Sequence, residues 1–460
     1  IELKPEGEFW LGILIFSQMK TCDWASLRLR RQALENELLA GGKATDPFPV
    51  LGLFDSPQLQ KKCSEIYTNN KLNLESQTGI VARIPKEEKI KIGYFSMDFC
   101  QHPVSYLVAE LIESHDRTKF EVYGFSFGIY TNDPMRMRME KAFDRFFDIQ
   151  SFSEFDAARL SREQRLDIAV DLGGHTRDAR PRIFAERAAP IQINYLGYPG
   201  TWGNNCVDYI VGDKVAIPDE NRAHFSEKII YMPNSFQVNP SYRTIAKNNL
   251  SKRDLGLPDE SFVFCCFNNS WKINPEMFGQ WMKILQRVPT SILWLYADNL
   301  SASANLKLEA TKQGVPADRI IFSKWTPRDE YIAQFKYADL FLDTLPYNAG
   351  TTASDALWAG LPVLTLMGRS FAGRMAASLL TSIGIPELIT YSRDEYCSVA
   401  IELASNPEKL ASINTKLAQN RSTTSLFDTK LFANHLETAY KAAYERYHSG
   451  QPPDHIHVGT

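Results

Sequence analysis

The hydrophobic positions of the chain follow two different periods, and the change between them lies near residue 89. From Glu8 to about Asn73 apolar residues recur at helical spacing, as in WLGILIFSQM and WASLRLRRQALENELLAG, with glycines and prolines between residues 41 and 57. The pattern predicts a helical N-terminal segment over residues 1–85. It is typical either of a cap on the next domain or of the end of a helical repeat array, of which the chain holds no second copy.

From Lys89 onwards, short apolar runs alternate with amphipathic helical stretches. The runs IKIGYFS, FEVYGFSFG, LDIAVDLGG and IQINYLGYP are separated by segments such as VSYLVAELIESH and PMRMRMEKAFDRF. A second series begins near Phe262 with FVFCCFNN, SILWLYAD, IIFSKW, LFLD and PVLTLMG, and it includes the helical stretch PEMFGQWMKIL. Alternation of this kind predicts parallel sheets with helices packed against them.

The two series predict an α/β protein with two doubly wound, Rossmann-like domains and a linker between them. Residues 234–259, which contain Pro240, Asn248 and Pro258, form the most turn-rich stretch between the series. We expect one domain over residues 86–240, a second over 241–449 and a tail over 450–460. Two such domains in tandem are expected to face each other across a cleft, with ligands at the carboxyl ends of the strands.

The composition of the 460-residue chain narrows the classes of function. Hydrophobic residues make up 44% and charged residues 23%, as in soluble globular proteins, and the formal charge of −3 argues against general nucleic-acid binding. Seven cysteines form no CxxC pair, which is typical of reduced thiols and predicts a cytoplasmic location. The apolar stretch FWLGILIF is far too short to cross a membrane. We therefore expect neither a nucleic-acid partner nor a membrane partner.

The stretch DTLPYNAGTTASDALWAGLPV carries the clearest candidate chemistry. A short apolar strand is followed by turn formers between Pro346 and Gly350, and Thr351 or Thr352 is a suitable N-cap for the helix that begins there. The start of a helix has unpaired N–H groups and a positive dipole, so this loop predicts a diphosphate site. Asp355 lies one turn into the helix and would suit a ribose hydroxyl. The alternative is an ordinary strand-to-helix connection capped by threonine.

Two further loops of the second domain follow buried strands. CCFNNSWKINP places Asn269 and Lys272 just beyond a strand, where Lys272 would stabilise charge on a departing diphosphate. SKWTPRDEY supplies Trp325, Arg328 and Tyr331, which could clamp a base by stacking and hydrogen bonds. The alternatives are a solvated surface lysine and aromatic side chains that belong to the core.

In the first domain, two histidines follow predicted strands. FSMDFCQHPVSY puts His102 at the start of a helix, where its imidazole could bind a sugar, act as a base or simply cap the helix. DLGGHT and LGYPGT are glycine-rich strand ends that allow close approach to a ligand, and His175 lies in the first of them. The sequence shows no HExxH, GxSxG, Cys/His metal spacing or DxD triad, so we expect no metal and no cofactor. The lysine, the threonines and the helix end would then neutralise the diphosphate.

These motifs together resemble the catalytic region of the O-linked N-acetylglucosamine transferase family, which includes bacterial members and the plant Spindly proteins. The resemblance runs from about Trp24 to the segment at Phe427 and beyond. It rests on SMDFCQHPVSY, GGHT, APIQINYLGYPGT, CCFNNSWKI, RIIFSKWTP, FLDTLPYNAGTTASDALWAGLPVLT and AASLL. It implies a GT-B fold of two Rossmann-like lobes, usually preceded by tetratricopeptide repeats, of which residues 1 to about 73 would be the end plus a connector.

The resemblance also implies roles for individual residues. His102 would contact the transferred sugar, Lys272 the β-phosphate, Thr351 and Thr352 the phosphates, and Asp355 the ribose. Thr326 and Arg328 would border uracil, Tyr331 would stack where animal enzymes use histidine, and Leu196, Gly197 and Pro199 would lie along the sugar. Asn269, Gly350 and His175 complete the set of residues that we expect to bind the nucleotide sugar.

The chain departs from the family pattern in three places. Bacterial and animal relatives usually have histidine where this chain has Gly350, whereas Spindly-type enzymes, which use GDP-fucose, also lack it. The helical histidine of animal enzymes aligns near Arg162, so no catalytic base is implied there. The large insert that animal enzymes carry between the lobes has no room in this chain.

The implied activity is a glycosyltransferase that moves N-acetylglucosamine from UDP-GlcNAc to Ser/Thr hydroxyls of protein acceptors, with inversion and without a metal. One alternative is a Spindly-like O-fucosyltransferase that uses GDP-fucose. The other is a scaffold that binds a nucleotide sugar without turnover.

Overall fold

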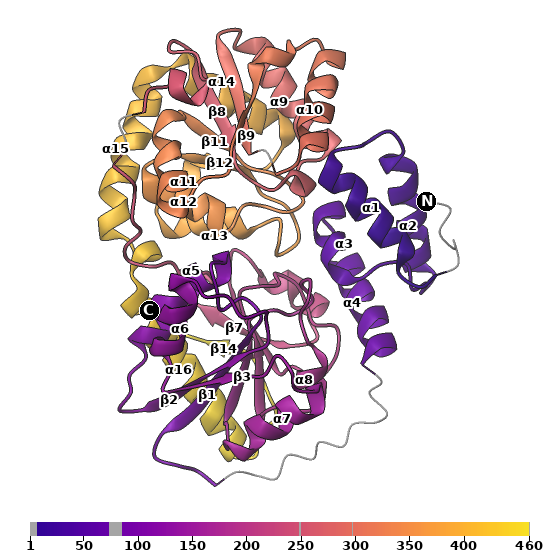
Figure 1. The fold of residues 1–460 in the computed structure, drawn as a ribbon, viewed down its shortest axis with the longest axis vertical. Helices are drawn as coiled ribbons and strands as arrows, with labels where there is room; N and C mark the ends of the chain where they lie inside the picture. Colours follow the sequence, from indigo (N-terminus) through magenta and orange to yellow (C-terminus); the bar gives the residue numbers. More distant parts are fainter. Residues whose placement is uncertain (1–6, 73–84, 248–249, 297, 460) are drawn as a thin grey trace. The chain divides into compact units, whose positions relative to one another are not determined.

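The computed structural model describes residues 7–72, 85–247, 250–296 and 298–459, and the chain divides into two compact units (Figure 1). Unit 1 comprises Ile1–Ala40, Leu51–Ser56 and Tyr242–Leu426, and unit 2 comprises Gly41–Val50, Pro57–Ser241 and Phe427–Thr460. Parts of the expected helical segment (residues 1–6 and 73–84) and of the expected linker (residues 248–249) lie outside the described residues.

Unit 2 is built on an eight-stranded parallel sheet. Its strands are β1 (Ile90–Ser96), β2 (Phe120–Ser126), β3 (Arg145–Asp148), β4 (Ile168–Asp171), β5 (Ile191–Asn194), β6 (Tyr209–Asp213), β7 (Lys228–Met232) and β14 (Ile456–His457). They lie in the order β3-β2-β1-β4-β5-β6-β7-β14. The order reverses between β1 and β4, the switch point at which open α/β sheets bind their ligands.

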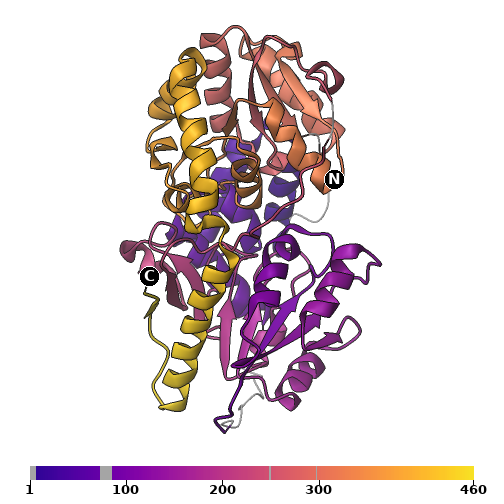
Figure 2. The same ribbon diagram turned by 90° about the vertical axis from the view of Figure 1, so that its left-hand side faces the viewer.

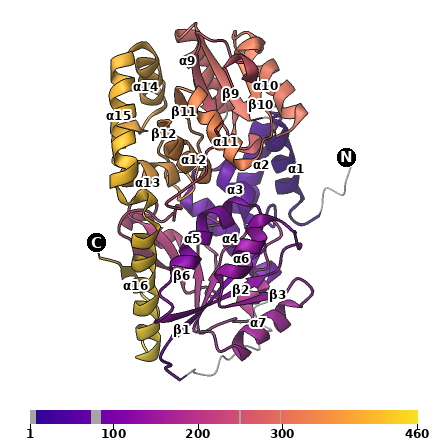
Figure 3. The ribbon, with the colours of Figure 1, turned by 60° about the vertical axis from the view of Figure 1, so that its left-hand side comes forward.

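Helices cover both faces of this sheet, so its central strands β4 and β5 are buried along their whole length. The helices are α4 (Pro57–Lys71), α5 (Pro103–Ser114), α6 (Pro134–Ala142), α7 (Glu154–Glu163), α8 (Arg182–Ala185) and α16 (Thr429–His448). One core contains buried residues of α5, α6 and α16, and the other contains buried residues of α7 and α8. Figure 3 shows α16 and α7 on opposite sides of strands β1 and β2. The long yellow helix in the lower part of Figure 2 is α16, which packs against α5, β5 and β7.

Unit 1 repeats the same architecture with six parallel strands. These are β8 (Phe262–Cys266), β9 (Ser291–Tyr296), β10 (Ile320–Ser323), β11 (Leu340–Leu342), β12 (Val363–Leu366) and β13 (Ile389–Thr390), in the order β10-β9-β8-β11-β12-β13. The reversal of strand order lies between β8 and β11, so this sheet has its switch point at the carboxyl ends of these two strands.

The helices of unit 1 come from both ends of its sequence. They are α1 (Trp10–Thr21), α2 (Leu27–Leu39), α9 (Pro275–Arg287), α10 (Leu300–Lys312), α11 (Arg328–Gln334), α12 (Thr351–Ala359), α13 (Met375–Ser382), α14 (Arg393–Ser405) and α15 (Pro407–Thr423). Helix α3 (Pro47–Leu53) crosses the boundary between the two units. Helix α1 packs on α10 and on the short 3-10 turn at Ser270–Lys272.

The two doubly wound sheets confirm the fold predicted from the alternating pattern, with corrections at particular elements. The helix expected to run through AFDRF ends at Ala142, and the next regular element, Arg145–Asp148, is the edge strand β3. This strand is charged at both ends, and both charged residues are exposed, which is how edge strands avoid pairing with other chains. Strands β6, β7, β13 and β14 were not predicted.

The division of the chain also differs from the expected boundaries. Helices α1 and α2 cluster with unit 1, so they do not form a separate domain. Helix α16 and strand β14, expected in the second domain and the tail, belong to unit 2. Within the residues described, no helix has the length and apolar character needed to cross a membrane.

Candidate active site

The candidate diphosphate loop of unit 1 lies at the switch point of its sheet. It leaves β11 at Asp343 and enters α12, whose first helical residues are Thr351 and Thr352. The expectation of a threonine N-cap was wrong, because Gly350 is the N-cap residue and no side chain caps this helix. The first N–H groups of α12 therefore keep their capacity to donate to an anion.

Lys272 lies against this loop, as the positions of the two strands predicted. It ends the 3-10 turn after β8, and its Nζ donates to the backbone oxygen of Asn348 at 3.0 Å. The ammonium group also lies 4.0 Å from the centre of the Tyr347 ring. Burial lowers the pKa of Lys272, and the nearby carboxylate of Asp343 opposes this shift. Lys272 is thus a half-buried cation whose position is set by its neighbours and not a freely solvated side chain.

Asp355 has partners that the sequence did not indicate. Its side chain is buried, and Arg328 donates to its two carboxylate oxygens at 2.9 and 3.3 Å. Arg243, which is also buried, donates to Asp355 and lies 3.1 Å from the hydroxyl of Ser354. The carboxylate expected to bind ribose is thus held by two guanidinium groups.

The aromatic residues after β10 separate into one exposed and one packed side chain. Trp325 is 74% exposed, so it is not part of the core. The Tyr331 ring packs against Phe267 and Phe335, with ring centres 6.0 and 5.3 Å apart, and burial raises the pKa of its hydroxyl. The expected clamp therefore has one side fixed on the core and one side open to solvent.

Two smaller candidates lie in the same loops. The hydroxyl of Thr326 accepts a hydrogen bond from the Gln334 side chain at 2.9 Å, which fixes it against α11. Asn269 is exposed at the start of the turn that carries Lys272.

In unit 2, His102 and Asp98 form a pair at the end of β1. Nδ1 of His102 lies 3.3 Å from Oδ2 of Asp98 and 3.3 Å from the backbone nitrogen of Val104. The neutral ring accepts from Val104 as the N-cap of α5, and the protonated ring can donate to Asp98. Burial lowers the pKa of His102 and Asp98 opposes this, while the side chain is still 42% exposed. Capping leaves Nε2 available, so it does not exclude a role in binding or proton transfer.

His175 is enclosed in the core of unit 2. Its ring lies among Tyr67, Tyr198 and Trp202, and its Nε2 lies 2.7 Å from the backbone oxygen of Trp202. Nδ1 is buried and has no partner among the described residues. Burial lowers the pKa of His175 to about 4, so the ring is neutral near pH 7. In this structure His175 braces the loop after β4 and is not exposed to a ligand.

The loop after β5 has a constrained backbone. Leu196 has a φ of 72°, a left-handed conformation that costs energy for a branched side chain. A Cβ on Gly197 would lie 2.0 Å from the backbone oxygen of Leu172, so only glycine fits there. Pro199 is buried. Backbone strain held in this way is common at ligand sites, which agrees with the role expected for this loop.

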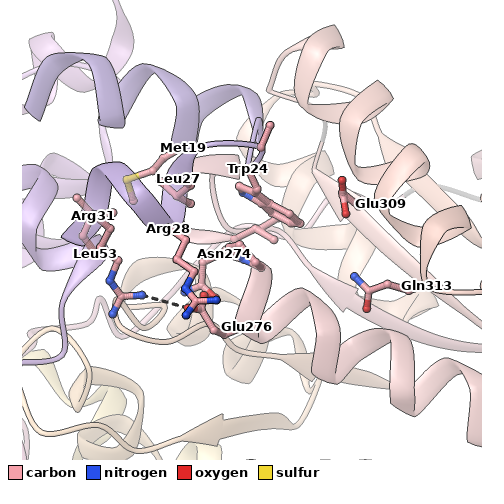
Figure 4. Close-up of a pocket in the computed structure, with 14 residues that line it drawn as sticks. Met19, Trp24, Leu27, Arg28, Arg31, Leu53, Asn274, Glu276, Glu309 and Gln313 are labelled. Atoms are coloured by element: carbon pink, nitrogen blue, oxygen red, sulfur yellow. Dashed lines mark hydrogen bonds and ion pairs between the residues drawn. The ribbon is translucent and has the colours of Figure 1, made fainter. Parts of the chain in front are cut away.

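A cavity of about 460 Å³ is lined in part by residues 273–276, the segment that follows Lys272 (Figure 4). Trp24, Arg28 and Arg31 line one side of it, and Asn274 and Glu276 at the start of α9 line another. Arg31 and Glu276 form an ion pair at 3.1 Å. Asn274 also donates to the backbone oxygen of Leu345 at 2.6 Å, which ties this wall of the cavity to the diphosphate loop.

Sequence reasoning missed three residues that organise this site. Arg243 lies in a segment without regular secondary structure, so no hydrophobic period or motif distinguishes it in the sequence. Asp343 directly follows β11, Asn268 comes two residues after the end of β8, and both are buried. A short polar side chain straight after an apolar strand, followed by turn formers, is a usable signal, because Asn and Asp bond to nearby backbone N–H groups. No cluster of three or more metal-binding side chains occurs within residues 7–72, 85–247, 250–296 and 298–459.

Two Rossmann-like units in one chain, each with candidate ligand residues at its switch point, define a glycosyltransferase-type GT-B-like fold. The model of glycosyl transferase family 41 matches residues 77–246 and 246–436. The chain therefore belongs to this family.

Similar proteins agree with this assignment. The structure of a mutant O-GlcNAc transferase from Thermobaculum terrenum superposes with a TM-score of 0.82 at 26% identity, covering 94% of this chain and 84% of that one. A protein of Arabidopsis thaliana named probable UDP-N-acetylglucosamine–peptide N-acetylglucosaminyltransferase SEC is 36% identical over 81% of this chain and 39% of its own length. A SPINDLY protein of Hordeum vulgare, given the same probable activity, is 32% identical over 80% of this chain and 39% of its own length. The chain thus spans about two fifths of the length of these curated relatives.

Proposed function

We propose that this chain is the catalytic region of a protein O-glycosyltransferase that transfers N-acetylglucosamine from UDP-GlcNAc to Ser/Thr hydroxyls. The observation that carries the proposal is the contact between Lys272 and the loop that leads into α12, at the switch point of the sheet. A half-buried cation and an uncapped helix start together form a site for a leaving diphosphate. The family relationship and the activity named for the relatives support the same donor.

In the proposed reaction the acceptor hydroxyl attacks the anomeric carbon as the bond to the diphosphate breaks and the hydroxyl proton is released to water, so the configuration at that carbon inverts. Negative charge grows on the bridging oxygen, and Lys272 and the first N–H groups of α12 stabilise it. These groups supply the charge that a metal ion supplies elsewhere, so the reaction is proposed to be metal-independent. His102 is proposed to contact the sugar through its Nε2.

The remaining assignments concern the nucleotide and the sugar. Tyr331 is proposed to pack against the base, with Thr326 and Arg328 at its edge. Thr351 and Thr352 donate to the phosphates, and Asn269 lies at the same edge of the site. Asp355 and Arg243 act together with Arg328, since the three side chains form one ion-pair cluster. Leu196, Gly197 and Pro199 are proposed to line the sugar.

A second donor is favoured by one observation. Gly350 provides no side chain at the N-cap of α12, where the resemblance places a histidine in bacterial and animal relatives but not in Spindly-type enzymes. GDP-fucose is therefore the alternative donor.

The test is transfer of labelled sugar by the purified chain to a peptide library and to lysate proteins. UDP-GlcNAc and GDP-fucose are compared at equal concentration, and titration calorimetry with UDP and GDP measures the affinity for each nucleotide. We expect transfer from UDP-GlcNAc and tighter binding of UDP. Transfer from GDP-fucose alone would replace the donor. Nucleotide binding without transfer from either donor would indicate a scaffold.

A further inference from the structure

A single buried carboxylate holds both ends of the candidate diphosphate loop. Asp343 is fully buried directly after β11. Its Oδ1 accepts from the backbone N–H of Thr344 at 2.8 Å and from that of Ala349 at 2.7 Å. Its Oδ2 accepts from the hydroxyl of Thr365 on β12 at 2.7 Å. The loop from Thr344 to Ala349 is thus closed on one side chain at its base.

The interior of the loop is fixed through the same base. The Thr344 hydroxyl accepts from Asn268 at 2.8 Å and donates to the Tyr347 carbonyl at 2.7 Å. The side chain of Asn348 donates to the backbone oxygen of Thr344 at 2.7 Å, and its own backbone oxygen accepts from Lys272. The position of Lys272 therefore depends on a network that begins at Asp343.

We propose that Asp343 is the positioning residue of the donor site: it sets the geometry of the diphosphate loop and keeps the ammonium of Lys272 charged and in place. The inference rests on the proposed function. Asp343 does not touch the donor in this assignment, because its oxygens accept from two loop N–H groups, from the Asn268 amide at 3.4 Å and from the Thr365 hydroxyl. It acts through Lys272 and through the N–H groups of α12.

Electrostatics give this arrangement a measurable signature. Burial raises the pKa of Asp343, while its donors and Lys272 lower it. The other titratable side chains that interact with it are Cys266 and Tyr396, whose pKa values are both raised by burial, so they are neutral at physiological pH. Protonation of Asp343 would remove the only charge facing Lys272 among these groups. Protonation would also add an O–H donor to a carboxyl group whose oxygens already accept hydrogen bonds from other donors.

The central experiment compares Asp343→Asn with Asp339→Asn. Asparagine can still accept from the two loop N–H groups and can donate to the Thr365 hydroxyl, so it removes the charge and retains the shape. Asp339 is the matched control, because it flanks the other end of β11 and accepts from the backbone N–H of Val263 at 2.7 Å. Both variants lose a backbone-binding carboxylate beside the same strand, but only one adjoins the loop.

We measure kcat and KM for UDP-GlcNAc, with GDP-fucose as second donor, and the affinity for UDP, each between pH 5 and pH 8. Asp343→Asn should lower kcat by about tenfold or more, the loss typical of removing an outer partner that orients a functional group, with UDP affinity within about threefold. The wild type should lose kcat towards pH 5, and Asp343→Asn should not show this acid limb. Asp339→Asn should retain the wild-type kcat and pH profile.

Several results would overturn the inference. These are a wild-type kcat in Asp343→Asn, an acid limb that persists in that variant, or an equal loss of kcat in Asp339→Asn. If Asp343→Asn fails to fold, a wild-type kcat that is flat from pH 5 to pH 8 also overturns it. If the wild type binds nucleoside diphosphate but transfers no sugar, the proposed function fails. Asp343 is then judged by UDP affinity, whose change between pH 7 and pH 5 must be smaller in Asp343→Asn than in the wild type. If the wild type binds no nucleoside diphosphate, both proposals fail.

Discussion

His175 should make the stability of unit 2 depend on pH in a way that can be calculated. Burial lowers its pKa from an ordinary value of 6.5 to about 4. Its Nε2 is satisfied by Trp202, whereas Nδ1 is buried without a partner among the described residues, so a proton added there would have no acceptor. Between these two pKa values the unfolded chain binds more protons than the folded one. The free energy of unfolding therefore falls as the pH falls.

The size of the effect follows from the two pKa values. A difference of about 2.5, at about 1.36 kcal/mol per pKa unit, corresponds to about 3 kcal/mol once the pH is below both values. At pH 7 almost none of this is lost, and at pH 5 about 2 kcal/mol is lost. We expect His175→Gln to lack this contribution, because glutamine has no proton to gain and its amide can still donate to the Trp202 carbonyl.

The assay is urea denaturation of wild type and variant at pH 7 and pH 5, followed by hydrogen exchange of peptides from β4 and β5. These strands flank the loop of His175, so the readout reports unit 2 and not the whole chain. The difference between the two proteins in their loss of stability should be about 2 kcal/mol. Equal losses would show that His175 is either solvated or already charged in the folded state, and would refute the reasoning.

Three further outcomes test the donor site. Lys272→Ala should lower kcat by about two orders of magnitude and UDP affinity much less, whereas Thr352→Ala should lower kcat less because neighbouring N–H groups remain. Single-turnover transfer and calorimetry measure both variants, and near-normal transfer by Lys272→Ala would contradict the diphosphate assignment. Tyr331→Ala should weaken UDP binding by about 1 kcal/mol or more, and an unchanged affinity in folded protein would assign Tyr331 to the core alone. EDTA should leave nucleotide binding unchanged, since the charge comes from Lys272 and backbone N–H groups, and a large loss on chelation would contradict a cation-free site.

The sequence predicted the strands and helices well wherever burial requires a regular pattern of apolar residues. Strands such as IAVD at Ile168–Asp171 are buried on both faces, so an apolar run in the sequence indicates the strand directly. The short edge strand Arg145–Asp148 and the strand Ile456–His457 leave no such record, because they are partly exposed or only two residues long. Helix α16 was placed in the wrong unit for another reason. The apolar face of α16 predicts that the helix is buried, but it does not indicate which of the two sheets the helix packs against.

The sequence predicted which loops form the candidate site, but not the side-chain contacts within it. Strand ends and helix starts placed Lys272 near the diphosphate loop, and the structure brings them together. The partners of Asp355 could not be predicted, because Arg243 is 112 residues away in sequence and reaches it only in the folded unit. The N-cap of α12 at Gly350 was missed because two threonines at the helix start have the stronger capping preference.

Unit 2 combines segments that lie before and after Tyr242–Leu426 of unit 1 in the sequence, and this affects how the protein can be made. Its eight-stranded sheet begins at β1 but takes its last strand from Ile456–His457, and one face of its core is completed by α16. During synthesis, the core residues of α5 can pack against α6 and the first strands, but they lack their α16 partners until residues 429–448 have left the ribosome. Unit 1, whose sequence ends at Leu426, is translated entirely before that point. The lobe whose first strand is made earlier is therefore the one that finishes folding later, and a nascent chain stalled after Leu426 would expose its apolar surface to chaperones.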